Sequence, residues 1–294
     1  MKNDFCTVAL VGKYQDPGVA DAVLEVADFL RRRGLTVWIE TDTASSLPVD
    51  RRGEVRDFDE IGAGCNLAVV LGGDGTMLYV AQKLAEDGVP LVGINRGRLG
   101  FLTDIGRDEA AERLGEILDG HYKAEARCML QAELVREGEV IARRLAFNDV
   151  VLSKGDKGRL IEFELSVDGE FVYAQRSDGL IVATPTGSTA YSLSTNGPIL
   201  HPTVRCIALV PIAPHALAAR PVTVPDSCEI ELVLHQPQDA GVFFDGHARA
   251  QLQPGDGVRI RRSPRDVQLL HPVNYSYFAM LREKLHWSTA PRIS

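Results

Sequence analysis

The chain has 294 residues, of which 45% are hydrophobic, and this is enough to fill one large core or two smaller ones. Its formal net charge of −8 argues against nucleic acid as the main partner, because phosphate backbones attract basic surfaces. Five widely spaced cysteines without a C-x-x-C pair, and no apolar run of about 20 residues, argue against a disulfide framework, a zinc site and a membrane span. The first residues lead directly into a strand-like run rather than a signal peptide, and we expect a cytoplasmic protein.

The first hundred residues alternate strand-like and helix-like patterns. Short apolar runs that are typical of buried strands occupy residues 7–11, 35–39, 67–71 and 91–94. Segments with apolar residues on one helical face occupy residues 21–33, 77–84 and 108–118. Repeated strand–helix units predict an α/β N-terminal domain in which helices pack on a parallel sheet.

The pattern changes after about residue 125, where apolar and polar residues begin to alternate. Ile161, Phe163 and Leu165, for example, alternate with glutamates and then meet the turn pair Asp168-Gly169. This alternation predicts a mostly antiparallel β domain. We therefore expect an α/β domain at residues 1–124, a β-rich domain at 125–270, and a partly helical tail at 271–294 that packs back on the first domain.

The run that ends at Leu71 is followed by Gly72-Gly73-Asp74-Gly75-Thr76 and then a helix-like segment, which is a suitable arrangement for binding phosphate. Glycines let backbone N–H groups approach an anion closely. Thr76 is expected to cap the helix, whose first amides favour negative charge. Asp74 is expected to be buried, and to take a proton from an attacking hydroxyl or to help order a metal ion. A tight turn with a capping acid is the alternative interpretation.

Two common nucleotide-binding motifs are missing from the chain. The loop has no Lys-Thr or Lys-Ser pair after its last glycine, so it is not a Walker A motif. No G-x-G-x-x-G follows the first strand, so a standard dinucleotide-binding fold is not indicated.

A second segment is dense in hydroxyl groups. A strand at 180–183 leads into Thr184-Pro185-Thr186-Gly187-Ser188-Thr189-Ala190-Tyr191-Ser192. Such a loop can hydrogen-bond a nucleotide, and the ring of Tyr191 can pack against a base. By itself it is also typical of a solvated turn or a helix cap.

Together the two segments resemble the NAD kinase family, whose members use ATP or polyphosphate, and the similarity extends along nearly the whole chain. The GGDGT loop alone is shared with lipid kinases, but its combination with TPTGSTAYS in this order is specific. Further motifs that look like the family are GINRGRLGFLTD at 93–104, FNDVVL at 147–152, QRSDG at 175–179, and HP at 271–272 with YSYF at 275–278.

The resemblance implies transfer of the γ-phosphoryl group of ATP to the 2′-hydroxyl of the adenosine ribose of NAD, which gives NADP. Asp74 would accept the proton of that hydroxyl, and Gly75 would line the site. The residues implied to bind phosphate are Gly72, Gly73 and Thr76. Mg²⁺ would neutralise the triphosphate, held mainly by phosphate oxygens and water, since the sequence offers no dedicated cluster of metal ligands.

The resemblance also implies a dinucleotide site in the second half of the chain. Asn148 and Asp149 would grip the ribose hydroxyls, and Asp149 is one methylene shorter than the Glu that is usual in the family. Asp178 would accept from the nicotinamide amide, with a structural salt bridge to Arg176 as the alternative. The other residues implied to contact the dinucleotide are Arg159, Arg176, Thr189, Ala190, Tyr191, Ser192, Ser194, His247 and Phe101. For Phe101 a core role, and for His247 a solvated turn, are the alternatives.

Two other classes of function remain open at this point. A lipid or sugar kinase would share the glycine–aspartate loop, but it predicts an apolar or basic pocket in place of TPTGSTAY. A dinucleotide sensor without turnover predicts loss of Asp74, which is present. We expect NAD and ATP as partners, no nucleic acid, no membrane, and a homodimer or homotetramer.

Overall fold

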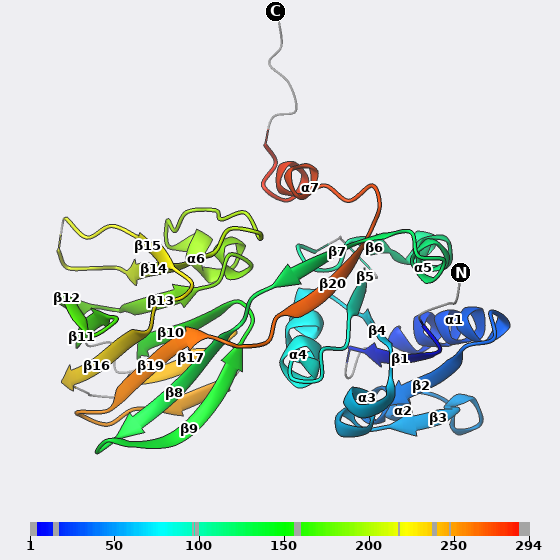
Figure 1. Ribbon diagram of the computed structural model, residues 1–294, viewed down its shortest axis with the longest axis horizontal. Coiled ribbons are helices and arrows are strands. Elements are labelled where there is room, and N and C mark those ends of the chain that lie inside the picture. The colour runs from blue at the N-terminus through cyan, green and yellow to red at the C-terminus, as the bar shows by residue number, and fades with distance from the viewer. Residues whose placement is uncertain are drawn as a thin grey trace, which may run out of the picture. The chain divides into compact units, whose positions relative to one another are not determined.

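The computed structural model describes residues 5–13, 18–95, 97, 100–155, 160–216, 218–236, 240–246 and 248–287. The chain forms two compact units, each with most of its residue contacts inside the unit (Figure 1). Unit 1 comprises residues 1–126 and 267–294, and unit 2 comprises residues 127–266. None of the helices in the described part of the chain is long and apolar enough to cross a membrane.

Unit 1 is built on one sheet in which most strands are parallel. Its strands are β1 (Thr7–Gly12), β2 (Thr36–Glu40), β3 (Glu54–Arg56), β4 (Leu67–Leu71), β5 (Leu91–Asn95), β6 (Ile105–Gly106), β7 (Tyr122–Arg127) and β20 (Val267–Pro272). They follow the order β3-β2-β1-β4-β5-β20-β7, with β6 beside β5. The pairs β1–β2, β1–β4, β2–β3, β4–β5, β5–β6 and β5–β20 are all parallel. This confirms the predicted parallel sheet.

Helices cover both faces of this sheet, because its central strands are apolar on both sides. The helices before β7 are α1 (Val19–Arg32), α2 (Thr41–Ser45), α3 (Phe58–Gly64), α4 (Asp74–Leu84) and α5 (Ala110–Leu118), with 3₁₀ turns η1 (Val49–Arg51) and η2 (Arg107–Glu109). A further helix, α7 (Tyr277–Lys284), follows β20. Figure 1 shows α1 and α5 on one face and α3 and α4 on the other. Val69 packs in one cluster with Val23 of α1 and Leu114 of α5. Its neighbour Val70 is equally buried although it points to the opposite face.

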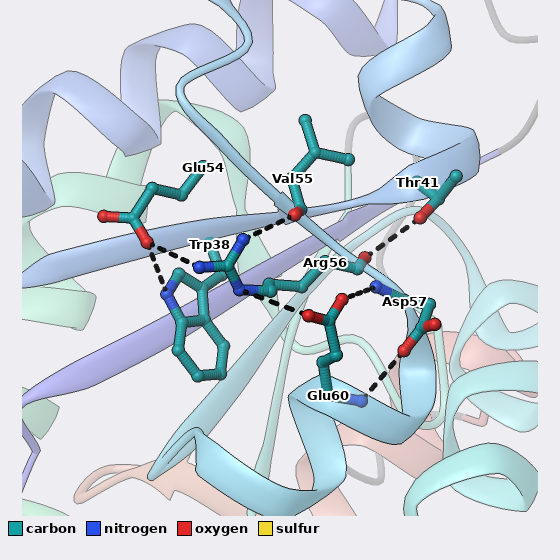
Figure 2. A network of polar contacts seen from close by, with 7 residues as sticks. All are labelled: Trp38, Thr41, Glu54, Val55, Arg56, Asp57 and Glu60. Carbon is teal, nitrogen blue, oxygen red and sulfur yellow. Dashed lines mark hydrogen bonds and ion pairs between the residues drawn. The ribbon is translucent and has the colours of Figure 1, made fainter.

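A polar network joins β2, β3 and the start of α3 (Figure 2). The indole nitrogen of Trp38 donates to Glu54 at 3.2 Å, and the Arg56 guanidinium lies 5.3 Å from the centre of the indole ring. Arg56 also pairs with Glu54 and with Glu60. Asp57 and Glu60 form a capping box that starts α3. These contacts fix the edge of the sheet without a large apolar core.

Residues 41–64 contain three elements that the sequence analysis did not predict: α2, β3 and α3. They are short, and β3 and α3 contain few buried residues. Their sequences therefore show neither the hydrophobic period of a helix nor that of a strand. The predicted helix at 108–118 begins as the 3₁₀ turn η2 and becomes α-helical at Ala110. The predicted helical character after residue 271 is found in α7, and it follows the strand β20.

Unit 2 contains two antiparallel sheets. Its strands are β8 (Leu130–Arg136), β9 (Glu139–Ala146), β10 (Asp149–Lys154), β11 (Ile161–Val167), β12 (Glu170–Ser177), β13 (Gly179–Ala183), β14 (Cys206–Ile212), β15 (Val222–Pro225), β16 (Ile230–Gln236), β17 (Ala240–Phe244), β18 (Ala248–Gln251) and β19 (Gly257–Arg262). One sheet has the order β15-β14-β13-β10-β17-β18, and the other has the order β12-β11-β16-β19-β8-β9. The predicted β-rich fold is confirmed.

The core of unit 2 lies between the two sheets. Side chains of both sheets, such as Leu152, Phe163 and Phe244, form one buried cluster. The predicted turn at Asp168-Gly169 joins β11 to β12, and both residues have positive φ, at 52° and 78°. A short helical segment, η3 (Gly187–Thr189) and α6 (Tyr191–Ser194), follows β13.

Candidate active site

The turn Gly72-Gly73 joins β4 to α4. Gly73 is the N-cap residue, with extended backbone angles of φ −98° and ψ −172°. A Cβ atom at Gly72 would lie 2.4 Å from Oγ1 of Thr76, whereas Gly73 and Gly75 have open space beside them. None of the three glycines has a positive φ. They therefore matter because they lack Cβ atoms, which leaves room for a group to approach the backbone.

The prediction that Thr76 caps the helix is wrong. Thr76 is the third residue of α4, its backbone N–H donates to the carbonyl of Gly73 at 3.0 Å, and no side chain caps this terminus. The helix starts earlier because the glycine turn already leads into it. In the described part of the chain, the amides of Gly73, Asp74 and Gly75 donate to no partner. Free amides at the positive end of a helix dipole are suited to bind an anion such as phosphate.

The carboxylate of Asp74 is held by the segment that follows β5. The amide of Phe101 donates to Oδ2 at 2.8 Å, and the amide of Leu102 donates to Oδ1 at 2.9 Å. The Thr103 hydroxyl lies 3.4 Å from the same Oδ1. A Cβ atom at Gly100 would lie only 1.9 Å from Oδ1, so this close approach requires glycine.

Asp74 is half-buried, not buried as the sequence analysis expected. Its oxygens are directed by backbone amides, which are rigid donors, yet the group keeps access to solvent. Each carboxylate oxygen has more than one lone pair, so the bonds to Phe101 and Leu102 leave acceptor capacity. The arrangement suits a proton acceptor whose position is fixed in advance.

Asn148 and Asp149 lie at the start of β10, where the side chain of Asp245 organises the backbone. Asp245 accepts from three consecutive amides: Phe147 at 2.8 Å, Asn148 at 2.7 Å and Asp149 at 3.1 Å. The carbonyl of Asn148 faces the hydroxyl-rich loop, since a Cβ atom at Gly187 would lie 2.0 Å from it. The two segments that the sequence analysis selected in unit 2 are therefore adjacent.

A cavity of about 350 Å³ opens beside these residues. It is lined by Asn148, Asp149, Val151, Ser153, Ala190, Tyr191, Phe243, Asp245 and Gly246. The sequence analysis named four of them, Asn148, Asp149, Ala190 and Tyr191, as site residues. It missed the others, although two could have been found: Val151 and Ser153 follow Asp149 at the two-residue period that places side chains on one face of a strand.

Burial, together with the negative charge of the nearby Asp245, raises the pKa of the Asp149 carboxyl from 3.8 to about 7. The side chain is only 4% exposed. Near neutral pH the Asp149 carboxyl therefore exists in both forms. It can donate a hydrogen bond when protonated and accept hydrogen bonds when ionised.

Three other residues that the resemblance implied do not line this cavity. The hydroxyl of Thr189 donates to the carbonyl of Thr186 at 3.1 Å, which stabilises the loop itself. Ser192 is fully buried, and its hydroxyl has no hydrogen-bond partner in the described part of the chain. Ser194 is exposed at the end of α6.

Asp178 forms an ion pair with Lys154, at 2.6 Å between Oδ1 and Nζ, on the neighbouring strand. Arg176, the partner that the sequence analysis considered, is exposed and forms no ion pair with another described residue. The pair of Lys154 with Asp178 could not be predicted from the sequence, because it depends on the register of β10 against β13. Arg159 and His247 lie outside the described residues.

Phe101 lies in unit 1, half-buried, and contributes its backbone amide to Asp74. No group of three or more His, Cys, Asp or Glu side chains that could hold a metal ion occurs among the described residues. Magnesium is commonly bound in proteins through one or two carboxylates together with substrate phosphates. Asp74, beside the free amides of α4, is the carboxylate that fits such an arrangement.

Comparison with protein families matches both halves of the chain. Residues 8–122 match the ATP-NAD kinase N-terminal domain, and residues 147–272 match the ATP-NAD kinase C-terminal domain. Curated relatives with the name NAD kinase include one from Aromatoleum aromaticum, which is 64% identical over 99% of this chain and 97% of the relative. Another, from an Azoarcus species, is 61% identical over 99% of both chains.

Solved structures show the same fold. The crystal structure of yeast NADH kinase complexed with NADH superimposes with a TM-score of 0.90 at 26% identity, covering 100% of this chain and 91% of the other. An NAD kinase from Archaeoglobus fulgidus in complex with ATP gives a TM-score of 0.75 at 27% identity, covering 95% of this chain and 98% of the other.

Proposed function

The chain belongs to the NAD kinase family and is a phosphotransferase that phosphorylates NAD, and we propose that Asp74 is the base of this reaction. The observation that supports this role most directly is the carboxylate of Asp74, held by two backbone amides beside the free amides of the α4 terminus. The carboxylate can meet a hydroxyl while the amides bind phosphate oxygens.

In the proposed reaction the 2′-hydroxyl of the adenosine ribose attacks the γ-phosphorus of ATP. The new bond joins the ribose oxygen to phosphorus, the bond from the γ-phosphorus to the bridging oxygen breaks, and ADP leaves. The hydroxyl proton passes to Asp74 and then to solvent, so that the products are NADP, ADP and a proton. A sugar hydroxyl is a weak nucleophile, so orientation and late proton removal are what one carboxylate can supply.

The phosphate groups of ATP are proposed to bind at the turn between β4 and α4. The free amides of Gly73, Asp74 and Gly75 point away from the helix, and Gly72 lets Thr76 pack closely behind the turn. Mg²⁺ is proposed to arrive with ATP, where it neutralises the triphosphate. Backbone donors do not depend on side-chain rotamers, which favours a fixed phosphate position.

The dinucleotide is proposed to occupy the cavity of unit 2. Asn148 and Asp149 would bind ribose hydroxyls, and Tyr191, which is 45% exposed at the mouth of the cavity, would stack on the adenine. The other contacts that the resemblance implied stay predictions for Phe101, Arg159, Arg176, Asp178, Thr189, Ser192, Ser194 and His247. The relatives do not support a lipid or sugar kinase, because those named here are NAD or NADH kinases.

Two further properties are proposed with this function. All five cysteines are free thiols, which fits the reducing cytoplasm. A homodimer or homotetramer remains our expectation for the assembled enzyme.

The direct test is to incubate the protein with magnesium, ATP and NAD, and to measure NADP with an NADP-specific dehydrogenase. Formation of NADP is expected. Fructose 6-phosphate and diacylglycerol serve as competing acceptors, and inorganic polyphosphate serves as a second donor. Phosphorylation of either competitor in place of NAD, or no transfer with any donor, would contradict the proposal.

A further inference from the structure

The imidazole of His271 lies between the carboxylates of Asp104 and Glu125, which have no role in the proposed reaction. His271 is on β20 and is only 2% exposed. Its Nδ1 atom lies 2.9 Å from Oδ2 of Asp104, and its Nε2 atom lies 4.0 Å from Oε1 of Glu125. The ring of Tyr275 stacks on the imidazole, with the ring centres 3.9 Å apart and the planes at 9°. The imidazole is therefore held at its edge by Asp104 and on its face by the ring of Tyr275.

Asp104 directly follows the residues that hold Asp74. The amides of Phe101 and Leu102 bind the two oxygens of Asp74, and the hydroxyl of Thr103 lies near one of them. After Asp104 the chain enters β6, where Ile105 is registered against Ile94 of β5. Asp104, whose carboxylate His271 contacts, is thus only two residues from Leu102 and three from Phe101, whose amides Asp74 contacts.

Other contacts hold the beginning and the middle of this segment. The side-chain amide of Asn95 donates to Thr103 Oγ1 at 3.0 Å, and the amide of Gly100 donates to the carbonyl of Thr103 at 2.9 Å. A Cβ atom at Gly93 would lie 2.7 Å from the carbonyl of Leu102, so the segment packs directly on β5. The hydrogen bond from His271 holds the other end of the segment, at the side chain of Asp104.

We infer that His271, through Asp104, is a positioning residue that keeps the amides of Phe101 and Leu102 aligned with the Asp74 carboxylate. The inference rests on the proposed role of Asp74 as base. Misplacing a reacting group by about 1 Å can cost about 100-fold in rate, so a contact two steps from the chemistry can limit turnover. Substrate binding depends on other residues and should change little.

The test compares two substitutions of His271. His271→Ala removes the donor, and kcat for NADP formation should fall by about 10-fold to 100-fold while KM for NAD and for ATP stays within about threefold. In His271→Asn the side-chain nitrogen stands as many bonds from the backbone as Nδ1 does, so it can again donate to Asp104 and should restore most of kcat. A purely structural role would not give this pattern of loss and rescue.

The matched control is Asn66→Ala. Asn66 accepts from the amides of Cys6 and Thr7, both at 3.0 Å, and precedes β4 at the end opposite to Gly72. This variant loses hydrogen bonds in unit 1 but leaves the Asp74 segment untouched, so its kcat should match the wild type. If His271→Ala does not fold, Asp104→Ala, which removes the acceptor of this hydrogen bond, takes its place, and a wild-type kcat in that variant would overturn the inference.

Hydrogen exchange gives a readout that does not require catalysis. The amides of Phe101 and Leu102 should exchange faster in His271→Ala than in the wild type or in Asn66→Ala, because their alignment with Asp74 is loosened. Unchanged exchange together with unchanged kcat would overturn the inference. Faster exchange combined with full activity of Asp74→Asn would support the positioning contact and overturn the proposed role of Asp74.

Discussion

The backbone amide of Asp149 donates to the Oδ1 atom of Asp245 at 3.1 Å, so two carboxylates share one wall of the unit 2 cavity. Their environments differ. Asp245 accepts from three amides, while the carboxyl of Asp149 is buried beside the negative charge of Asp245. The consequence is a carboxyl at Asp149 that keeps its proton to about pH 7.

This raised pKa predicts how the stability of the wild type depends on pH. Below pH 3.8 the Asp149 carboxyl is protonated in the folded and the unfolded chain. From about pH 4 to pH 7 the unfolded chain releases the proton and the folded chain retains it, so this group lowers the free energy of unfolding as pH rises. Asp149→Asn cannot titrate. As pH rises from 5 to 8, the free energy of unfolding of the variant should increase by about 1–3 kcal/mol relative to that of the wild type. Urea unfolding at each pH measures this difference.

Asp245→Asn is the contrasting variant for this experiment. It replaces one of the two oxygens that accept from the amides of Phe147, Asn148 and Asp149 by an amide that donates. It should therefore be less stable than the wild type at both pH values. A constant difference between Asp149→Asn and the wild type from pH 5 to pH 8 would show that the pKa of Asp149 is not raised.

Asp74→Asn should lower kcat by at least about 100-fold, because the amide cannot accept the hydroxyl proton. KM for NAD should stay within about threefold, since the cavity of unit 2 is unchanged. Initial rates of NADP formation and equilibrium binding of NAD provide the two measurements. A variant that loses binding as much as rate, or that keeps its rate, would contradict the role of Asp74 as base.

The sequence was sufficient for elements whose residues carry one clear hydrophobic pattern. The run at 67–71 is a strand because all five residues are buried on both faces of a parallel sheet. The alternation of Ile161, Phe163 and Leu165 likewise placed β11 and its core-facing side correctly. The glycine–aspartate loop was found because its glycines, free amides and carboxylate are contiguous in the chain.

The sequence was not sufficient for contacts that only the fold creates. Asp245 is 96 residues from Asp149, and His271 is 167 residues from Asp104, so no local pattern links them. The ion pair of Lys154 with Asp178 depends on strand register in the same way. The Thr76 prediction failed for a local reason, because the helix begins three residues earlier than its apolar pattern indicates.

Removing the ring of Tyr191 should weaken binding of NAD more than binding of ATP. The ring lies at the mouth of the cavity and is 45% exposed, so it has a face available for stacking. Stacking of an aromatic side chain on a base contributes about 1–3 kcal/mol, so KM for NAD should rise by about 10-fold in Tyr191→Ala. Tyr191→Phe keeps the ring and should behave as the wild type. Equal NAD affinity in all three proteins, measured by calorimetry, would remove Tyr191 from the adenine site.

Gly100→Ala should reduce turnover by displacing the Asp74 carboxylate. A Cβ atom at Gly100 would lie 1.9 Å from Oδ1 of Asp74, so the carboxylate or the segment must move. Movement of about 1 Å predicts a fall in kcat of about 100-fold.

Gly106→Ala is the matched control, because no atom lies within 4 Å of the Cβ that it would add and β6 follows directly from the same segment. Both variants replace glycine by alanine, so both reduce the conformational entropy of the unfolded chain by the same amount. Steady-state assays should therefore show wild-type kcat for Gly106→Ala and the loss only for Gly100→Ala. Equal rates for the two variants would mean that the position of the Asp74 carboxylate does not limit the reaction.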